Sequence, residues 1–359
     1  MESVVFELTE GLNRAGIQTD VMCAHSGART STHRAPAGYE ITRVGSWGTV
    51  ASSSICPRMV PLLRQIADRY ELMHVHLPNP MVNLAVLLSG FKGRVVLHWH
   101  SDIVKQRRAM KFYEPLQFWL LRRADSIIST SSAYADSSRY LADWRHKVVP
   151  IPIGIDPSAL AVDPEALERL RNKYRGRRIV FALGRLTYYK GFRYLIDAAA
   201  HLPDNVAVLI GGSGELAGVL QEQARRKGLA GRVEMLGNIP ARDLGAYYAL
   251  CDVFCLPSIA RSEAFGVVML EAMAFSKPVV ATEIPGSGVP WVNQHGVSGL
   301  NVPIENSVAL AAAIRTLIEN EHLRSTLGTG ARGRLERHFC APRMIGSTID
   351  AYEALTHRV

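Results

Sequence analysis

Short apolar runs typical of β-strands alternate with helical stretches along almost all of this 359-residue chain. Strands of a first series are predicted at residues 19–24, 39–44, 72–76, 94–100, 126–130 and 147–151. Strands of a second series are predicted at residues 178–183, 206–210, 232–236, 253–256 and 278–281. Helices are predicted at 2–14, between most of the strands, and from 307 to the end. Such alternation favours parallel sheets covered by helices on both faces, which makes the chain an α/β protein.

A Pro/Gly-rich segment, residues 150–157 with the sequence PIPIGIDP, separates the two series. Segments of this composition are typical of links between domains. We therefore expect two Rossmann-like doubly wound domains facing a cleft, over residues 1–153 and 154–340, and a final helix over 341–359 that packs back toward the first domain. In such sheets ligands bind at the carboxyl ends of the strands.

The composition is that of a soluble globular enzyme of two domains, with 48% hydrophobic and 20% charged residues. No apolar run has the length that a membrane-spanning helix needs, and the acidic first residues do not resemble a signal peptide. The five cysteines are odd in number and dispersed, which favours reduced core thiols over a disulfide or metal site. These features predict a cytoplasmic protein.

The formal net charge of +9 is uneven along the chain. Residues 92–123 hold eight Lys and Arg against two acids, interleaved with the aromatic residues Phe112, Tyr113, Phe118 and Trp119. We predict a basic amphipathic surface around Lys105–Arg123 that contacts an anionic membrane. The alternative is a solvated helix whose aromatic side chains face the core. No nucleic-acid-binding motif is found, and Pro115 argues against one unbroken helix over 104–123.

Two glutamates stand eight residues apart in the segment SEAFGVVMLE. Glu263 is predicted in the loop after the strand at 253–256, and Glu271 about two turns into the helix that begins near Gly266. The N–H groups of a helix N-terminus attract phosphate. Carboxylates on either side can then accept hydrogen bonds from the hydroxyls of a sugar and a ribose. This segment therefore suggests a nucleotide-sugar site.

Two cations follow the first strand of the second series, in the segment LGRLTYYKGF. Arg185 and Lys190 can clamp a diphosphate there and stabilise the charge on a leaving group, or they can be surface ion-pair residues. Gly212, in the segment GGSGE after the next strand, permits close approach of backbone to a ligand, although a plain tight turn explains it equally well.

Histidines mark the ends of two strands in the first series. His100 at the end of its strand is expected to face the cleft, where it can bond a sugar hydroxyl. His98 lies deeper on the same face and is expected to be structural, and His74 and His76 alternate in the same way. No Asp-x-Asp triplet occurs, so neither a metal ion nor another cofactor is predicted at the diphosphate.

Taken together, these segments resemble family four of the glycosyltransferases, which are retaining enzymes with the GT-B fold. The resemblance covers nearly the whole chain. It rests on Gly184–Leu186 with Lys190 and Gly191, on the two-glutamate segment with Phe265 and Gly266, on Leu256–Ser258, on His100, and on Gly299 and Leu300.

The resemblance implies a role for each motif. Arg185 and Lys190 would bind the donor diphosphate, with Gly184 and Gly212 beside them. Glu271 would hold the ribose, and Glu263 the donor sugar. The remaining contacts would be backbone N–H groups at Phe265 and Gly266, the base beside Leu236 to Ile239, and His100 near the reacting carbon. The catalytic set would be Glu263, His100, Arg185 and Lys190.

The implied activity is transfer of a hexose, mannose or a related sugar, from a GDP- or UDP-sugar. The implied acceptor is a lipid-linked glycan of polysaccharide or lipopolysaccharide biosynthesis, reached by peripheral attachment to the inner face of the plasma membrane. Family members begin with a strand and a glycine loop that would precede Met1, so the chain is expected to start at an internal Met or to be a fragment with impaired activity. The alternatives are a nucleotide-sugar epimerase or hydrolase of the same fold, and a truncated non-catalytic member of an assembly complex.

Overall fold

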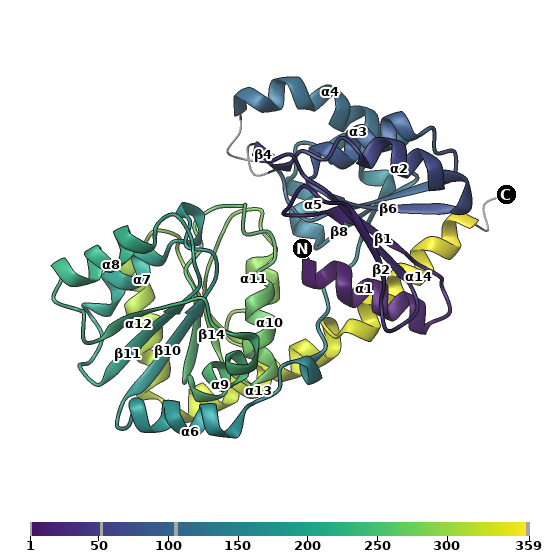
Figure 1. Cartoon of the computed structure of the whole chain (residues 1–359). Coiled ribbons are helices and arrows are strands. Elements are labelled where there is room, and N and C mark those ends of the chain that lie inside the picture. Colours follow the sequence, from purple (N-terminus) through teal and green to yellow (C-terminus); the bar gives the residue numbers. More distant parts are fainter. Residues whose placement is uncertain (1, 51–52, 104–106, 357–359) are drawn as a thin grey trace. The chain divides into compact units, whose positions relative to one another are not determined.

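The structure, a computed structural model, describes residues 2–50, 53–103 and 107–356, and for residues 107–112 it describes the backbone only. The chain divides into two compact units. Unit 1 comprises Met1–Gly154 together with Ala341–Val359, and unit 2 comprises Ile155–Cys340 (Figure 1). The chain thus leaves unit 1 in the Pro/Gly-rich segment and returns to it for its last helix.

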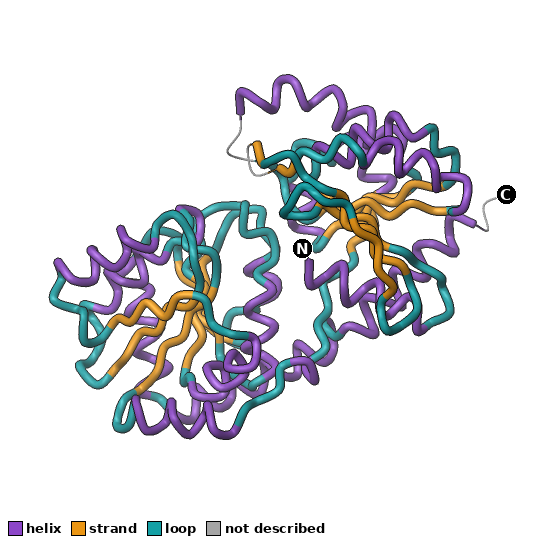
Figure 2. The backbone as a smooth tube through the Cα atoms, viewed as in Figure 1, coloured by secondary structure: helices purple, strands orange, loops and turns teal. Residues whose placement is uncertain are grey.

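Unit 2 is built on six parallel strands in the order β12-β11-β10-β13-β14-β15. Strands are orange in Figure 2, and helices are purple. These strands are β10 (Arg178–Leu183), β11 (Val206–Gly211), β12 (Val233–Gly237), β13 (Val253–Leu256), β14 (Val279–Thr282) and β15 (Gly299–Val302). The helices are α6 (Pro164–Lys173), α7 (Phe192–Ala199), α8 (Ala217–Arg226), α9 (Ala241–Leu250), α10 (Val267–Ala274), α11 (Val289–Val292), α12 (Ser307–Glu319) and α13 (Glu321–His338). Two short 3-10 turns are η3 (Pro157–Ala159) and η4 (Tyr188–Lys190).

Helices cover both faces of the unit 2 sheet. On one face, the buried side chains of α7, α8 and α12 form one core with Val180 and Ala182 of β10. On the other face Phe181, which lies between them in β10, packs edge-on against Tyr248 of α9 with ring centroids 5.3 Å apart. Strands buried on both faces need apolar side chains at successive positions, which explains their continuous apolar runs in the sequence.

Unit 1 has its strands in several groups. The four parallel strands β6 (Leu72–Leu77), β7 (Arg94–Trp99), β8 (Ser126–Ser129) and β9 (Val148–Pro150) pair in that order. A second group has the order β1-β3-β2, formed by β1 (Val21–Ala24), β2 (Ser31–Arg34) and β3 (Glu40–Val44), and a third pairs β4 (Thr49–Val50) with β5 (Ser53–Ser54). The helices are α1 (Glu2–Arg14), α2 (Met59–Ile66), α3 (Pro80–Ser89), α4 (Arg107–Arg123), α5 (Ser132–Ser137) and α14 (Ala341–Thr356), with the 3-10 turns η1 (Ala67–Arg69) and η2 (Ala142–Lys147).

The α/β class with two Rossmann-like units is confirmed, with three local departures from the predictions. Strand β2 runs antiparallel to β3, so the strands of unit 1 do not all run parallel. Strands β2, β4, β5 and β15 were not predicted. The expected break at Pro115 is wrong, because α4 continues through it. Pro115 is exposed, and on an exposed face water can satisfy the carbonyl that loses its hydrogen bond to proline.

Candidate functional site

The order of the unit 2 strands reverses between β10 and β13. From β10 the chain adds β11 and β12 on one side, and it then returns to place β13 on the other side. The segments after the carboxyl ends of β10 and β13 are therefore neighbours, and such a reversal is where open α/β sheets bind ligands. The segment after β10 carries Arg185 and Lys190, and the segment after β13 carries Glu263.

A buried ion pair lies at this reversal. The Nζ of Lys190 is 2.5 Å from the Oε2 of Glu263, and each residue is 8% exposed. The hydroxyl of Ser258 donates a second hydrogen bond to the same carboxylate oxygen at 2.9 Å. Burial alone would lower the pKa of Lys190, but the adjacent carboxylate of Glu263 outweighs burial and raises that pKa. Lys190 is therefore held as a cation beside the carboxylate of Glu263.

Backbone hydrogen bonds position the Glu263 loop from both sides. The Ile259 N–H donates to the carbonyl of Tyr189 at 2.8 Å, which attaches the loop to η4. The Gly288 N–H donates to the carbonyl of Ala264 at 2.8 Å, and the hydroxyl of Ser287 donates to the carbonyl of Glu263. The carboxylate of Glu263 is thus presented by a fixed loop.

The N-terminus of α10 follows that loop directly. Gly266 is the N-cap with φ +79°, and no side chain caps this helix within the described residues. A Cβ at Gly266 would lie 2.7 Å from the Cε of Met269 and 2.8 Å from the Cδ2 of Leu256, so a larger residue would disturb the entry to α10. The first N–H groups of a helix have no intrahelical acceptor, and they favour an anion. Phe265 is buried at the same position, with 3% of its surface exposed.

Glu271 lies a little over one turn into α10, not the two turns expected from the sequence. The phenol of Tyr248, on α9, donates to its Oε2 at 2.5 Å. Burial raises the pKa of the Glu271 carboxyl, although the hydrogen bond from Tyr248 and the charge of Lys190 act in the opposite direction. The hydrogen bond holds the carboxylate in one orientation, and within the described part of the chain no hydrogen bond is made by Oε1.

The turn after β10 is tied to the Gly-rich loop after β11. The Leu186 N–H donates to the carbonyl of Ser213 at 2.8 Å. Gly212 has φ +123°, and a Cβ there would lie 2.0 Å from the carbonyl oxygen of Gly184. Only glycine permits this approach to the neighbouring turn, and the predicted approach of Gly212 to a ligand stays a prediction. Arg185 on that turn is exposed, and its guanidinium forms no ion pair with any residue that the structure describes.

Leu236 and Ile239 lie at the end of β12, beside the same loop, and both are half-buried. The Gly212 N–H donates to the carbonyl of Gly237 at 2.7 Å, which joins this segment to the Gly-rich loop. The structure therefore brings every predicted donor residue of unit 2 to the carboxyl edge of one sheet. Their individual contacts with a donor stay predictions.

His100 belongs to unit 1 and follows β7 by one residue. It is half-buried, and its Nε2 lies 2.9 Å from the Nδ1 of His76. Burial lowers the pKa of His100 well below its ordinary value, and His76 lowers it further. The imidazole is thus neutral at neutral pH, in which state it can donate and accept hydrogen bonds.

Sequence reasoning gave no role to two residues of this arrangement. Ser258 belongs to the segment Leu256–Ser258, and its position just after β13 is the sequence feature that could have indicated a role in the site. Tyr248 sits on a helix with no motif around it, so nothing in the sequence pointed to its hydrogen bond with Glu271.

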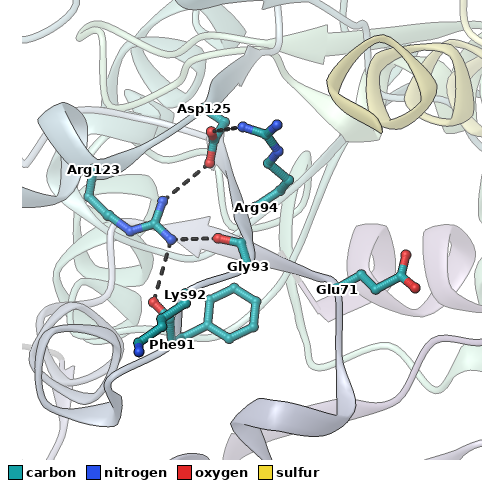
Figure 3. A pocket seen from close by; sticks show the side chains of 7 residues that line it. All are labelled: Glu71, Phe91, Lys92, Gly93, Arg94, Arg123 and Asp125. Carbon is teal, nitrogen blue, oxygen red and sulfur yellow. Dashed lines mark hydrogen bonds and ion pairs between the residues drawn. The ribbon is translucent and has the colours of Figure 1, made fainter. Parts of the chain in front are cut away.

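A hollow of about 700 Å³ in unit 1 lies at the opposite end of β7 from His100 (Figure 3). Its lining consists of Glu71, Phe91, Lys92, Gly93, Arg94, Arg123 and Asp125. Asp125 pairs with Arg94 at 3.0 Å and with Arg123 at 3.2 Å. Arg123 also donates to the carbonyls of Phe91 and Gly93. Because sheets of this kind bind ligands at the carboxyl ends of their strands, this hollow at the amino end of β7 is not part of the candidate site.

The predicted basic surface lies partly outside the described residues, which omit Lys105 and the side chains of residues 107–112. In the remainder of α4, Phe118 is 39% exposed and Arg122 is exposed. The phenol of Tyr113 accepts a hydrogen bond from the buried Asn83 of α3, so this ring faces the interior. Among residues 2–50, 53–103 and 107–356, no helix combines the length and apolarity that crossing a bilayer requires.

Comparison with known protein families gives two matches that together cover most of the chain. Residues 1–159 match the family described as Glycosyltransferase Family 4, and residues 165–334 match the family described as Glycosyl transferases group 1.

Individual proteins agree with these family matches. The O-antigen chain mannosyltransferase C of Escherichia coli is 33% identical over 99% of this chain and 94% of its own length. The D-rhamnosyltransferase WbpZ of Pseudomonas aeruginosa is 32% identical over 95% of this chain and 88% of its own length. Among solved structures, Anabaena HepE in complex with UDP and glucose superposes with a TM-score of 0.80 and 21% identity, covering 98% of this chain and 96% of that one. This last likeness concerns the fold.

Proposed function

Since this chain belongs to the glycosyltransferases of family four, we propose that it transfers mannose or a closely related hexose from a GDP- or UDP-sugar to a lipid-linked glycan. The observation that carries the proposal is the buried Lys190–Glu263 pair beside the N-terminus of α10. It puts a cation, a carboxylate and helical N–H groups where a diphosphate and a polyhydroxyl sugar would be held together. The names of the two relatives, a mannosyltransferase and a rhamnosyltransferase, support the choice of sugar.

In the proposed reaction, the bond between the anomeric carbon and the diphosphate breaks while the acceptor hydroxyl attacks from the same face. Arg185, Lys190 and the N–H groups near Phe265 stabilise the negative charge that develops on the diphosphate. That diphosphate takes the proton from the acceptor hydroxyl, because the carboxylate of Glu263 is already engaged by Lys190 and Ser258. A hydroxyl of the donor sugar binds Glu263, and the ribose binds the Oε1 of Glu271. We propose no metal ion at the diphosphate, since the two cations supply the charge.

The test is a transfer assay with purified protein, a panel of GDP- and UDP-hexoses, and membrane lipids that carry glycan acceptors. We expect sugar to appear in the lipid fraction with one donor, and that donor to be consumed only when acceptor lipid is present. Rapid conversion of the donor without acceptor would favour the epimerase or hydrolase instead. If neither GDP nor UDP raised the melting temperature of the protein, the proposed donor site would be wrong and the non-catalytic alternative favoured.

We also propose that unit 1 contacts the anionic inner face of the plasma membrane, so that the protein is cytoplasmic and peripheral. The support comes from α3, where Leu84, Leu87 and Leu88 are 37%, 40% and 50% exposed at positions that share one face of a helix. Helix α3 packs against α4, which adds the exposed Phe118 and Arg122. Exposed leucines beside a basic helix suit the boundary between lipid headgroups and acyl chains.

A charge on this face is expected to weaken membrane binding. The double variant Leu87→Glu/Leu88→Glu should bind vesicles containing phosphatidylglycerol at least about tenfold more weakly than wild type. Each carboxylate would lie near anionic headgroups, which repel it, and near acyl chains, which do not solvate it. Flotation or sedimentation of the vesicles measures the bound fraction. The control is Val219→Glu, which charges a residue 59% exposed on α8 of unit 2. Equal binding by the double variant and wild type would contradict the membrane surface.

A further inference from the structure

Four histidines form a ladder on one face of β6 and β7 in unit 1. His76 of β6 is the direct neighbour of His98 of β7, with ring centroids 4.9 Å apart. His74 stacks on His76 at 4.7 Å and His100 stacks on His98 at 4.3 Å. Strand pairing places alternate residues of neighbouring strands on the same face, so the ladder is a direct product of the alternating histidines in both segments.

Part of this ladder lacks hydrogen-bond partners. His98 is fully buried, and neither of its ring nitrogens has a hydrogen-bond partner among the described residues. The Nε2 of His74 is likewise without one. A buried polar atom left without a partner destabilises the folded protein, so a histidine with only a packing role is a poor choice for this position.

The hydrogen bonds that the ladder does make leave nitrogen lone pairs for a ligand. The Nδ1 of His74 contacts the phenol oxygen of Tyr352 on α14, and the Nδ1 of His76 contacts the Nε2 of His100 at 2.9 Å. If each Nδ1 carries the proton in these contacts, the Nε2 of both rings is an acceptor. An outer hydrogen bond of this kind is what orients a metal-binding histidine and fixes its tautomer.

We propose that His74, His76 and His98 bind one divalent transition-metal ion of the class that prefers imidazole nitrogen, with Zn²⁺ as the representative. The three residues can each offer one ring nitrogen such that all three nitrogens lie within 4.8 Å of one another. Zinc–nitrogen bonds of about 2.0–2.1 Å require a closer approach, so the rings of His74 and His76, which are stacked with an interplanar angle of 1°, must turn toward a common point when the ion binds.

His98 is fully buried and His74 and His76 are half-buried, all within unit 1. This site shares no residue with the donor residues of unit 2. Through the hydrogen bond from His76, the ion would also hold the tautomer of His100.

The test uses the full chain without a polyhistidine tag, freed of metal by a chelator and titrated with ZnCl₂ against a chromophoric chelator at pH 7.5. We expect one ion to bind per chain and the melting temperature to rise. The variant His74→Gln should bind Zn²⁺ at least about tenfold more weakly, while the control His201→Gln, at an exposed position in unit 2, should match wild type. Melting curves in the presence of chelator establish that both variants are folded.

A second variant separates metal binding from packing. Tyr352→Phe keeps the ring but removes the outer hydrogen bond to His74, and it should weaken Zn²⁺ binding about tenfold with one ion still bound per chain. Co²⁺ in place of Zn²⁺ should give the visible absorption of nitrogen-coordinated cobalt in wild type and not in His74→Gln. No stoichiometric binding by folded wild-type protein, or equal binding by His74→Gln, would overturn the proposal.

Discussion

Lys190→Ala is expected to lower the turnover number for sugar transfer by about 10²–10³-fold. The substitution removes the cation that lies 2.5 Å from Glu263 and that we assign to the departing diphosphate. It also leaves the carboxylate of Glu263, 8% exposed, without its countercharge, which should cost about 3 kcal/mol in the free energy of unfolding. Turnover is measured with saturating donor and acceptor, and stability by urea denaturation of the same preparation.

Two further variants show which of these losses is catalytic. Lys190→Met with Glu263→Gln removes both charges, so it should recover much of the stability and none of the turnover. Lys227→Ala breaks another ion pair of the same unit, with Asp197 at 3.0 Å, in which the lysine side chain is 43% exposed, and it should change neither quantity appreciably. Turnover close to that of wild type in a folded Lys190→Ala protein would refute the role of this lysine.

Arg185→Ala is expected to lower turnover about 10²-fold without a measurable loss of stability. Arg185 is exposed and forms no ion pair with a described residue, so its removal should change the free energy of unfolding by less than about 0.5 kcal/mol. Arg185 is expected to act when charge develops on the diphosphate. The substitution should therefore lower the turnover number more than it raises the KM for the acceptor. Steady-state kinetics at varied acceptor concentration measure both.

Arg185→Lys is the informative companion, because lysine keeps the charge but cannot form two parallel hydrogen bonds to a phosphate. It should recover only part of the lost turnover. Arg193→Ala, on an exposed arginine of α7 whose guanidinium lies over Tyr194, is the matched control and should resemble wild type. If only the KM for the acceptor rose in Arg185→Ala, this residue would contact the acceptor and not the diphosphate.

The strands of unit 2 could be found in the sequence because they are buried on both faces. Strand β11, for example, is buried along its whole length and shows as an unbroken apolar run. Strand β2 was missed for the opposite reason: all four of its residues are exposed, so no alternation of apolar and polar residues marks it. Helix α4 was divided at Pro115 because the sequence does not tell which face of a helix a proline occupies.

The positions of residues at strand ends were enough to predict which residues belong to the candidate site. They were not enough to predict the contacts among those residues. The pairing of Lys190 with Glu263 depends on β13 lying next to β10, and hydrophobic periodicity carries no information on strand order. The hydrogen bond of Tyr248 to Glu271 depends on how α9 packs beside α10, for the same reason. The histidine ladder was visible as alternation in two segments, but only the register of β6 and β7 shows that the four rings stack.

The return of the chain to unit 1 for α14 has a consequence for the order of events during synthesis on the ribosome. Helix α14 packs against α1, where Gly11 leaves the space that the side chain of Ile345 occupies. The buried face of α1, which includes Leu8 and Leu12, therefore cannot be covered by α14 until more than three hundred further residues have been synthesised. Unit 2 is one continuous stretch and has all its strands before α14 emerges. The unit made first is thus the last that can close, and its nascent form exposes apolar surface for most of translation.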